Sequence, residues 1–201
     1  EMTSSLVGSE MCIRDRVFYM DFKNANELLT LCEEQNISIS EVMRNREIIT
    51  GECPAKEADQ KMARVLEIMK EAARSPIEKP IRSMGGLIGG EAAKLRELED
   101  LGAGVNGSLL ALATRNAVAV LETNATMGVI VAAPTAGSAG VIPAVLLSLQ
   151  EVHGFSDAQL MDALKNAAVV GSIIARNATV AGAEGGCQAE IGSAAAMAAS
   201  A

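Results

Sequence analysis

The segment N-A-T-V-A-G-A-E-G-G-C-Q-A-E-I-G-S, residues 177–193, organises the rest of the sequence. Glycines lead up to a single cysteine, Cys187, and an alanine-rich run follows from Gln188. Glycine adopts backbone conformations that other residues avoid and lets a ligand approach closely, so we expect a loop up to Cys187 and a helix from Gln188 onward. A thiolate offered from such a loop can bind iron. A lone cysteine among glycines is more often a small buried apolar residue, and the segment by itself leaves both interpretations open.

A second glycine-rich segment, A-A-P-T-A-G-S-A-G at 132–140, leads into an apolar run that we expect to be a helix. Backbone N–H groups at a helix start bind anions, and the hydroxyls of Thr135 and Ser138 add further donors. The carboxylate of an amino acid fits such a loop as well as a phosphate does. The alternative is an ordinary tight connection between two helices.

A third segment, R-S-M-G-G-L-I-G-G-E-A-A-K-L at 82–95, offers another set of donors at Ser83, Gly85 and Gly86. Each of these loops, taken alone, is explained as a simple connection between two helices. Three of them in one chain favour a shared cleft for a small ligand.

Composition limits the class of protein. The 201 residues carry a formal net charge of −8, with 49% apolar and only 2% aromatic residues. The absence of a basic run and the scarcity of aromatic residues for base stacking argue against a nucleic-acid partner. A core of Ala, Val, Ile, Leu and Met suits closely packed helices, and we expect an all-α fold.

Nothing in the sequence indicates secretion or a membrane span. The four cysteines form no C-x-x-C pair, and no apolar stretch with a cleavage site marks a signal peptide, so a reducing cytoplasm is expected. Residues 123–150 carry no charge, but prolines and glycines interrupt them. In lipid these breaks would leave backbone polar groups without partners, so we interpret the stretch as buried protein.

The chain divides into three parts by pattern. Residues 1–19 lack a clear period and are expected to be a non-native or disordered leader. Residues 20–79 form amphipathic patterns typical of a small helical subdomain. Residues 80–201 are expected to form a helical catalytic domain with glycine-rich loops, incomplete at the C-terminus because the last alanine-rich helix has no end signal.

Local signals predict where helices begin and end. Asn24, Ser38 and Ser156 each have the side chain of an N-cap residue, followed three residues later by Glu or Gln. A third helix is expected to begin after Pro54 and to stop at Pro76.

In the second half, the spacing of apolar residues predicts helices over 91–100, 108–123, 141–151 and 157–176. The second of these is expected to bury Leu109, Leu110 and Leu121.

With its three loops, the chain resembles the alpha subunit of the bacterial iron–sulfur-dependent L-serine dehydratases, over about 20–201 and most specifically over 124–192. The resemblance implies a lyase that converts L-serine to pyruvate and ammonia. It implies a [4Fe-4S] cluster held by three cysteines, with one iron left open to activate the leaving hydroxyl. Cys187 matches the first of the three cysteines, and the other two lie in a further segment. A beta subunit is implied as the partner that completes the site.

The substrate-binding candidates lie in or beside the three loops: Ser83, Gly85, Gly86, Asn124, Thr135, Gly137, Ser138 and Asn177. Ala139 stands where family members commonly have a cysteine, and we expect this to have little effect. No residue is assigned as the catalytic base. His153, the single histidine, is better explained as a solvated or capping residue, and Lys94 as a surface lysine.

Three alternatives stay open. The chain as given is an inactive fragment of such an enzyme, or a pyridoxal-phosphate lyase, or a nucleotide-binding module. A pyridoxal-phosphate enzyme needs a Schiff-base lysine, and neither Lys94 nor Lys165 stands in a suitable motif. A nucleotide site on residues 129–140 would lack both G-x-G-x-x-G and the Walker lysine.

Overall fold

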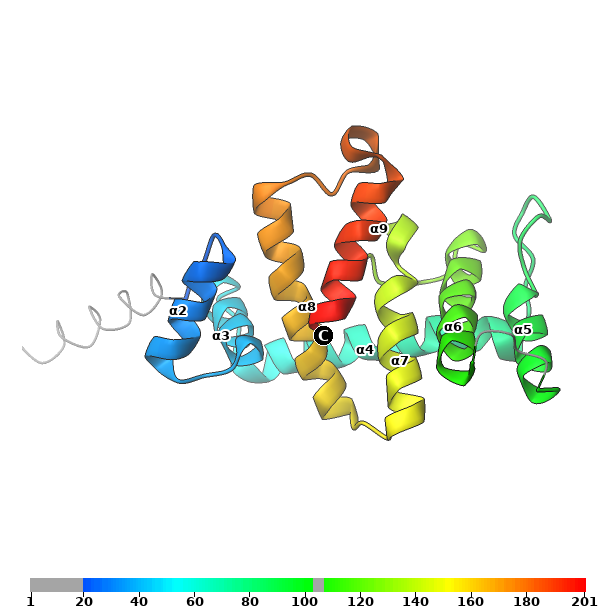
Figure 1. Ribbon diagram of the computed structural model, residues 1–201, viewed down its shortest axis with the longest axis horizontal. Coiled ribbons are helices and arrows are strands. Elements are labelled where there is room, and N and C mark those ends of the chain that lie inside the picture. Colours follow the sequence, from blue (N-terminus) through cyan, green and yellow to red (C-terminus); the bar gives the residue numbers. More distant parts are fainter. Residues whose placement is uncertain (1–19, 103–106) are drawn as a thin grey trace, which may run out of the picture. The chain divides into compact units, whose positions relative to one another are not determined.

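The computed structural model describes residues 20–102 and 107–201. Within these ranges all regular structure is helical, with eight α-helices, one short 3-10 helix and no strand (Figure 1). The predicted all-α class is confirmed. The chain divides into two compact units between Lys61 and Met62, inside one helix, and the predicted leader, 1–19, lies outside the described residues.

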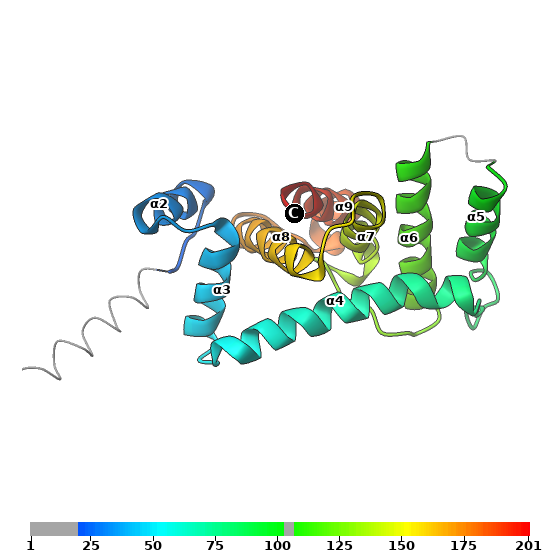
Figure 2. The same ribbon diagram turned by 90° about the horizontal axis from the view of Figure 1, so that it is seen from below.

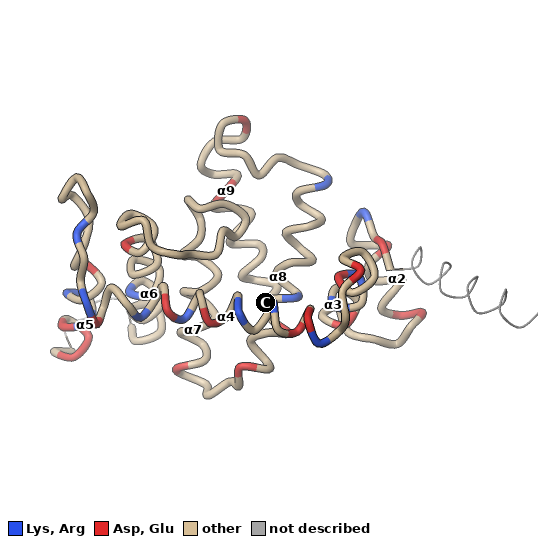
Figure 3. The backbone as a smooth tube through the Cα atoms, turned by 180° about the vertical axis from the view of Figure 1, so that it is seen from behind, with Lys and Arg blue, Asp and Glu red and all other residues tan. Residues whose placement is uncertain are grey.

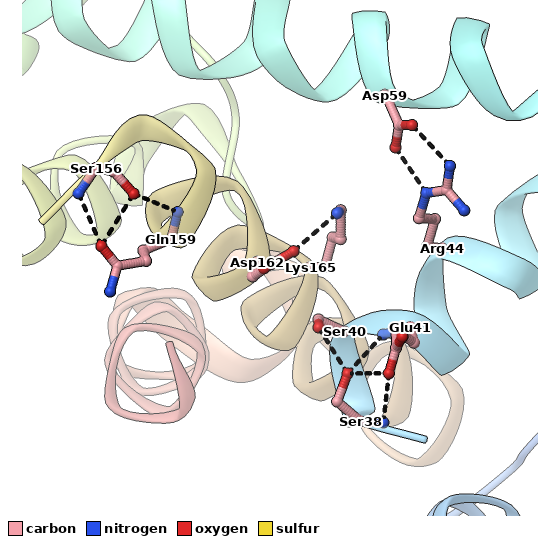
Figure 4. A network of polar contacts seen from close by, with 9 residues as sticks. All are labelled: Ser38, Ser40, Glu41, Arg44, Asp59, Ser156, Gln159, Asp162 and Lys165. Atoms are coloured by element: carbon pink, nitrogen blue, oxygen red, sulfur yellow. Dashed lines mark hydrogen bonds and ion pairs between the residues drawn. The ribbon is translucent and has the colours of Figure 1, made fainter. Parts of the chain in front are cut away.

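The first unit holds α2 (Ala25–Gln35), α3 (Ile39–Thr50) and the beginning of α4 (Ala55–Glu78). The predicted N-caps of its first two helices are confirmed. The Asn24 side chain accepts a hydrogen bond from the backbone N–H of Glu27. Ser38 and Glu41 form a reciprocal capping box, and Arg44 binds both carboxylate oxygens of Asp59 at 2.8 and 2.7 Å, joining α3 to α4 (Figure 4).

The second unit contains the remainder of α4 and five further α-helices. These elements are α5 (Glu91–Asp100), α6 (Ser108–Ala125), the 3-10 helix η1 (Ala136–Ser138), α7 (Val141–His153), α8 (Asp157–Asn177) and α9 (Gly182–Ser200). Figure 2 shows α4 crossing the helices of this unit. The core brings Leu66 of α4, Leu146 of α7 and Leu164 of α8 together with small and apolar residues of α9.

The predicted end of the third helix at Pro76 is wrong, because α4 continues to Glu78. A proline within a helix has no N–H group to donate to the carbonyl four residues earlier. For Pro76 the carbonyl left without this donor is that of Ala72. The Thr123 hydroxyl of α6 donates to that carbonyl at 2.7 Å. Ala72 is only 2% exposed, so this hydrogen bond satisfies an acceptor that water does not reach, and the helix runs through the proline.

The expected burial of leucines along α6 is also wrong. Leu109, Leu110 and Leu121 are 40%, 56% and 49% exposed, whereas Arg115 and Glu122 are 4% and 1% exposed. The buried face of α6 therefore carries Arg115, Asn116 and Glu122 beside Ala119 and Val120, and its two charged side chains have partners on neighbouring elements. Arg115 forms ion pairs with Glu99 of α5 and Glu151 of α7, and Glu122 binds backbone groups at the start of α5.

Charge is distributed unevenly over the helices. Figure 3 shows acidic and basic residues spread along α2 to α5, while α7, α8 and α9 carry few. Residues 129–131, which the sequence left open between a strand turn and a helix end, adopt neither. In the part of the chain that the structure describes, no helix has the length and apolar character needed to cross a bilayer.

Thr123→Val is expected to lower the free energy of unfolding by about 1–3 kcal/mol, because the buried Ala72 carbonyl would lose its donor. Chemical denaturation measures the loss. Pro76→Ala restores an N–H group at the correct helical position, so the same Thr123→Val change should cost clearly less in that background. An equal cost in both backgrounds would contradict the proposed compensation.

A pH-dependent contact joins α4, α7 and α8. The Asp157 carboxylate accepts hydrogen bonds from Lys70 at 2.5 Å and Gln150 at 2.8 Å, and these bonds lower the pKa of Asp157 below its ordinary value of 3.8, with Lys70 the larger cause. A carboxylate whose pKa falls on folding stabilises the folded state above the unfolded pKa. That stability is lost as the pH falls through the folded pKa.

Asp157→Asn should therefore reduce stability at neutral pH by less than about 1 kcal/mol, because the pair is exposed to solvent. The difference from the wild type should shrink as the pH falls through the lowered pKa of Asp157. Thermal unfolding between pH 2 and 7 measures it, with Asp162→Asn as the control for losing one negative charge from α8. A difference that persists unchanged to pH 2 would show that the ionised carboxylate is not its source.

Candidate functional site

The glycine-rich segments lie at one edge of the second unit. Because α6, α7, α8 and α9 alternate in direction, the C-terminal ends of α6 and α8 and the N-terminal ends of α7 and α9 come to the same side, at the top of Figure 1. The loop before α5 extends toward the same side. We refer to this side of the second unit as the glycine-rich edge.

The loop before α7 brings several predicted residues together. Thr135 and Ser138 join their hydroxyls at 3.2 Å, and Asn124 at the end of α6 donates from its amide to the Ala136 carbonyl at 3.1 Å. Ser138 is 1% exposed and also donates to the Ala133 carbonyl. The Ser138 hydroxyl therefore holds the turn in shape, while Thr135 is only half-buried and stays within reach of a ligand.

The same loop contacts α9 through a carboxylate that sequence reasoning missed. A Cβ atom added to Gly137 would lie 3.3 Å from Oε2 of Glu190, and one added to Gly182 would lie 3.1 Å from it. The Glu190 carboxylate thus occupies a slot between two glycines, one in η1 and one in the first turn of α9. The sequence did contain one signal for Glu190. It is an acidic residue inside a glycine-rich segment, in the second half of the chain, where charged residues are few.

The expectation of a loop up to Cys187 needs correction, because helical structure begins at Gly182. The Ala181 carbonyl accepts hydrogen bonds from Glu184 and Gly185, which closes a helical turn. Gly186 then leaves the helix with φ 74° and ψ 171°. That positive φ favours glycine, so the break depends on Gly186, and Cys187 is the first residue of the helical segment that follows.

Cys187 is exposed and has a free thiol, as a cluster ligand requires. The other described cysteines lie in the first unit. Cys53 is buried, and partial burial raises the pKa of the Cys32 thiol, with Glu33 a smaller cause. Among the described residues no group of three or more His, Cys, Asp or Glu side chains could hold a metal ion. Since an iron–sulfur cluster needs several thiolates, the described residues contain no complete ligand set for one.

The loop before α5 forms a turn closed on itself. Ser83 and Ile88 exchange hydrogen bonds, and the Gly86 N–H donates to the Ser83 carbonyl at 2.8 Å. Cβ atoms added to Gly85 or Gly86 would meet no atom within 4 Å, and Gly86 has a φ of 71°. The hydrogen bonds of Ser83 stay within its own turn and do not join it to the other candidate residues.

Glu122 anchors this loop at its base. Its carboxylate accepts hydrogen bonds from the backbone N–H groups of Gly90 at 3.0 Å and Ala92 at 2.7 Å. Negative charge at a helix N-terminus is favourable. Glu91 in turn accepts from the Gly89 N–H, and this bond is the main cause that lowers the pKa of Glu91. Sequence reasoning missed Glu122, although it is the one charged residue between positions 116 and 150.

The remaining candidates lie at helix ends or on the surface. The Asn177 amide donates to the Ile173 carbonyl at 2.8 Å and so satisfies an acceptor in the last turn of α8. His153 is exposed at the end of α7, with its ring 5.7 Å from that of Phe155. Lys94 is exposed on α5. Neither of the two contacts places its side chain against the loop before α7.

Together these features define a helical protein with a glycine-rich edge suited to a small polar ligand. Residues 34–201 match the family model described as serine dehydratase alpha chain. The chain therefore belongs to the serine dehydratase alpha chain family.

Individual relatives agree with the family match. The chain is 41% identical over 180 residues to the probable L-serine dehydratase, alpha chain, of Bacillus subtilis, covering 90% of this chain and 60% of the relative. It is 37% identical over 177 residues to the L-serine dehydratase, alpha chain, of Peptoniphilus asaccharolyticus, covering 88% and 61%. L-serine dehydratase 2 of Escherichia coli is 35% identical over 190 residues, covering 89% and 40%. The chain thus spans about three fifths of the two alpha chains.

Glu122→Gln is expected to speed amide hydrogen exchange at Gly90 and Ala92 by at least about tenfold, which corresponds to roughly 1.4 kcal/mol. The reason is that a neutral amide has one acceptor oxygen for two N–H donors. Residue-resolved hydrogen exchange measures the effect. Glu97→Gln, an exposed change on α5, is the matched control. Unchanged exchange at both amides would show that the carboxylate does not anchor the loop.

Proposed function

We propose that this chain acts in an L-serine dehydratase, which dehydrates and deaminates L-serine to pyruvate and ammonia. Family membership supports the reaction class. The observation that carries the proposal is the glycine-rich edge, where Asn124, Thr135 and Gly137 lie next to the helix that presents Cys187. The proposed catalytic domain is the helical region 80–201, with 20–79 as a smaller helical subdomain.

The substrate carboxylate is the group that the loops are suited to bind. The turn at Thr135 leads directly into α7, whose first N–H groups have no partners within the helix, and an anion is favoured at that end. Thr135 adds a hydroxyl, and the turn at Ser83, Gly85 and Gly86 is proposed as a second set of donors. Asn124 and Asn177 shape the edge through their bonds to backbone carbonyls.

The proposed cofactor is a [4Fe-4S] cluster to which Cys187 contributes one thiolate. Its other ligands come from outside the described residues, because these contain no complete metal-binding group. When bound, such a cluster supplies a Lewis-acidic iron that assists departure of the substrate hydroxyl. This chain's own part is to hold the amino acid with its hydroxyl toward the thiol.

A beta chain is the proposed partner. Loss of the Cα proton together with the hydroxyl gives an enamine that hydrolyses to pyruvate and ammonia, so the reaction needs a base. His153 closes α7 twelve residues after the helix starts at Val141, about 18 Å from the edge along the axis. His153 is the single histidine of these 201 residues, so we propose that the beta chain or a further segment supplies the base at this edge.

The cluster proposal is tested by anaerobic reconstitution with iron and sulfide. The proteins are this chain and a chimera that joins it to the unmatched part of the Bacillus subtilis relative. Cluster absorbance and bound iron in the chimera are expected to be lost in Cys187→Ala and retained in Cys32→Ala, because only Cys187 stands exposed at the edge. Serine turnover is then measured with the beta chain added.

Three results would contradict the proposal. Iron binding that survives Cys187→Ala would remove this residue as a ligand. A chimera that never binds iron would remove the cluster. Serine turnover that requires pyridoxal phosphate and not iron would replace the cluster with the alternative cofactor.

A further inference from the structure

The Glu190 carboxylate lies at the centre of the glycine-rich edge. It contacts the loop before α7 at Gly137 and the first turn of α9 at Gly182, with oxygen atoms 3.3 and 3.1 Å from the positions that Cβ atoms would take. Glu190 is half-buried. It also follows Cys187 by three residues in the same helical segment, and residues three apart share a helix face.

The neighbouring carboxylates at this edge are already in use. Glu122 binds the backbone N–H groups of Gly90 and Ala92. Glu184 accepts a hydrogen bond from the Thr179 hydroxyl at 2.8 Å. Within the described residues, the Glu190 carboxylate lies beside Gly137 and Gly182 and makes no hydrogen bond or ion pair. It is the acidic group at this edge that is left for a ligand.

An amino-acid substrate needs such a group. Its carboxylate is matched by the N–H and hydroxyl donors of the loops, but its ammonium group requires an acceptor, and an ionised carboxylate makes the strongest hydrogen bonds to it. Partial burial strengthens this interaction, because fewer water molecules compete. The second half of the chain contains only six acidic residues, so a carboxylate held in a slot here is not explained as part of a charged surface.

We propose that the Glu190 carboxylate binds the α-ammonium group of the amino-acid substrate, and this inference rests on the proposed function. Glu190 is thereby a substrate-binding residue that selects amino acids over hydroxy acids of the same length. A Cβ atom at Gly137 or Gly182 would lie 3.3 or 3.1 Å from the carboxylate, so alanine at either position would make the carboxylate shift by a few tenths of an ångström. Binding the ammonium at Glu190 and the carboxylate at the start of α7 fixes two of the substituents on Cα.

The test compares two probes that differ only in the ammonium group. L-serine and 3-hydroxypropanoate share a carboxylate and a hydroxyl, but the second compound carries hydrogen where serine carries the ammonium. Affinities are measured by ligand-observed NMR on the cluster-free chain, which does not consume the substrate. The wild type is expected to prefer L-serine. Glu190→Gln should weaken L-serine binding about tenfold or more, as expected for losing a charged partner, and leave 3-hydroxypropanoate unchanged.

Two further variants separate binding from folding. Gly182→Ala keeps the carboxylate but displaces it, and should weaken L-serine binding in the same selective way. Glu184→Gln, in the same helix, is the matched control and should change neither affinity. Retained affinity for 3-hydroxypropanoate shows that a variant still has an intact site.

Each contrary result has a distinct meaning. L-serine binding that is equal in wild type and Glu190→Gln overturns the assignment of Glu190 alone. Equal loss of both probes overturns it in favour of a purely structural role. A wild-type chain that binds neither probe overturns the proposed substrate site, and this assignment with it.

Discussion

The buried carboxylate of Glu122 determines how the glycine-rich edge is built. A charge that is 1% exposed must be compensated inside the protein, and the compensation here is the pair of backbone N–H groups at the start of α5. This ties α5 and the turn before it to the C-terminal half of α6. Two residues further along α6, Asn124 holds the loop before α7, so one helix end positions two of the three glycine-rich segments.

Local side-chain chemistry was sufficient to predict most helix starts. Ser38 and Ser156 cap their helices through residues only three positions away, so their signals are complete within a short window of sequence. The extension of α4 through Pro76 could not be predicted in this way. It depends on Thr123, which is 51 positions away from the Ala72 carbonyl that it satisfies, and only the packing of α6 against α4 brings the two together.

The same distinction applies to the site. Glycine content drew attention to the segments around Gly137 and Cys187, because a close approach or a positive φ requires glycine at particular positions. Glycine content did not show which side chain packs against these glycines. The slot that holds Glu190 is formed by two glycines 45 positions apart, and the helical turn before Gly186 depends on the bonds to the Ala181 carbonyl. Neither the slot nor this helical turn could be predicted from the residues next to it in the sequence.

The edge provides groups suited to binding a small polar ligand more clearly than groups suited to transforming one. Hydroxyl, amide and carboxylate groups meet there, yet the single histidine lies at the far end of α7 and the exposed thiol has no second cysteine among the described residues beside it. Recognition and reaction therefore make different demands on this unit. The first is met by rigid helix ends held by Glu122 and Asn124. The second requires ligands and a base brought to the same edge, which is why we place a cluster and a beta chain against it.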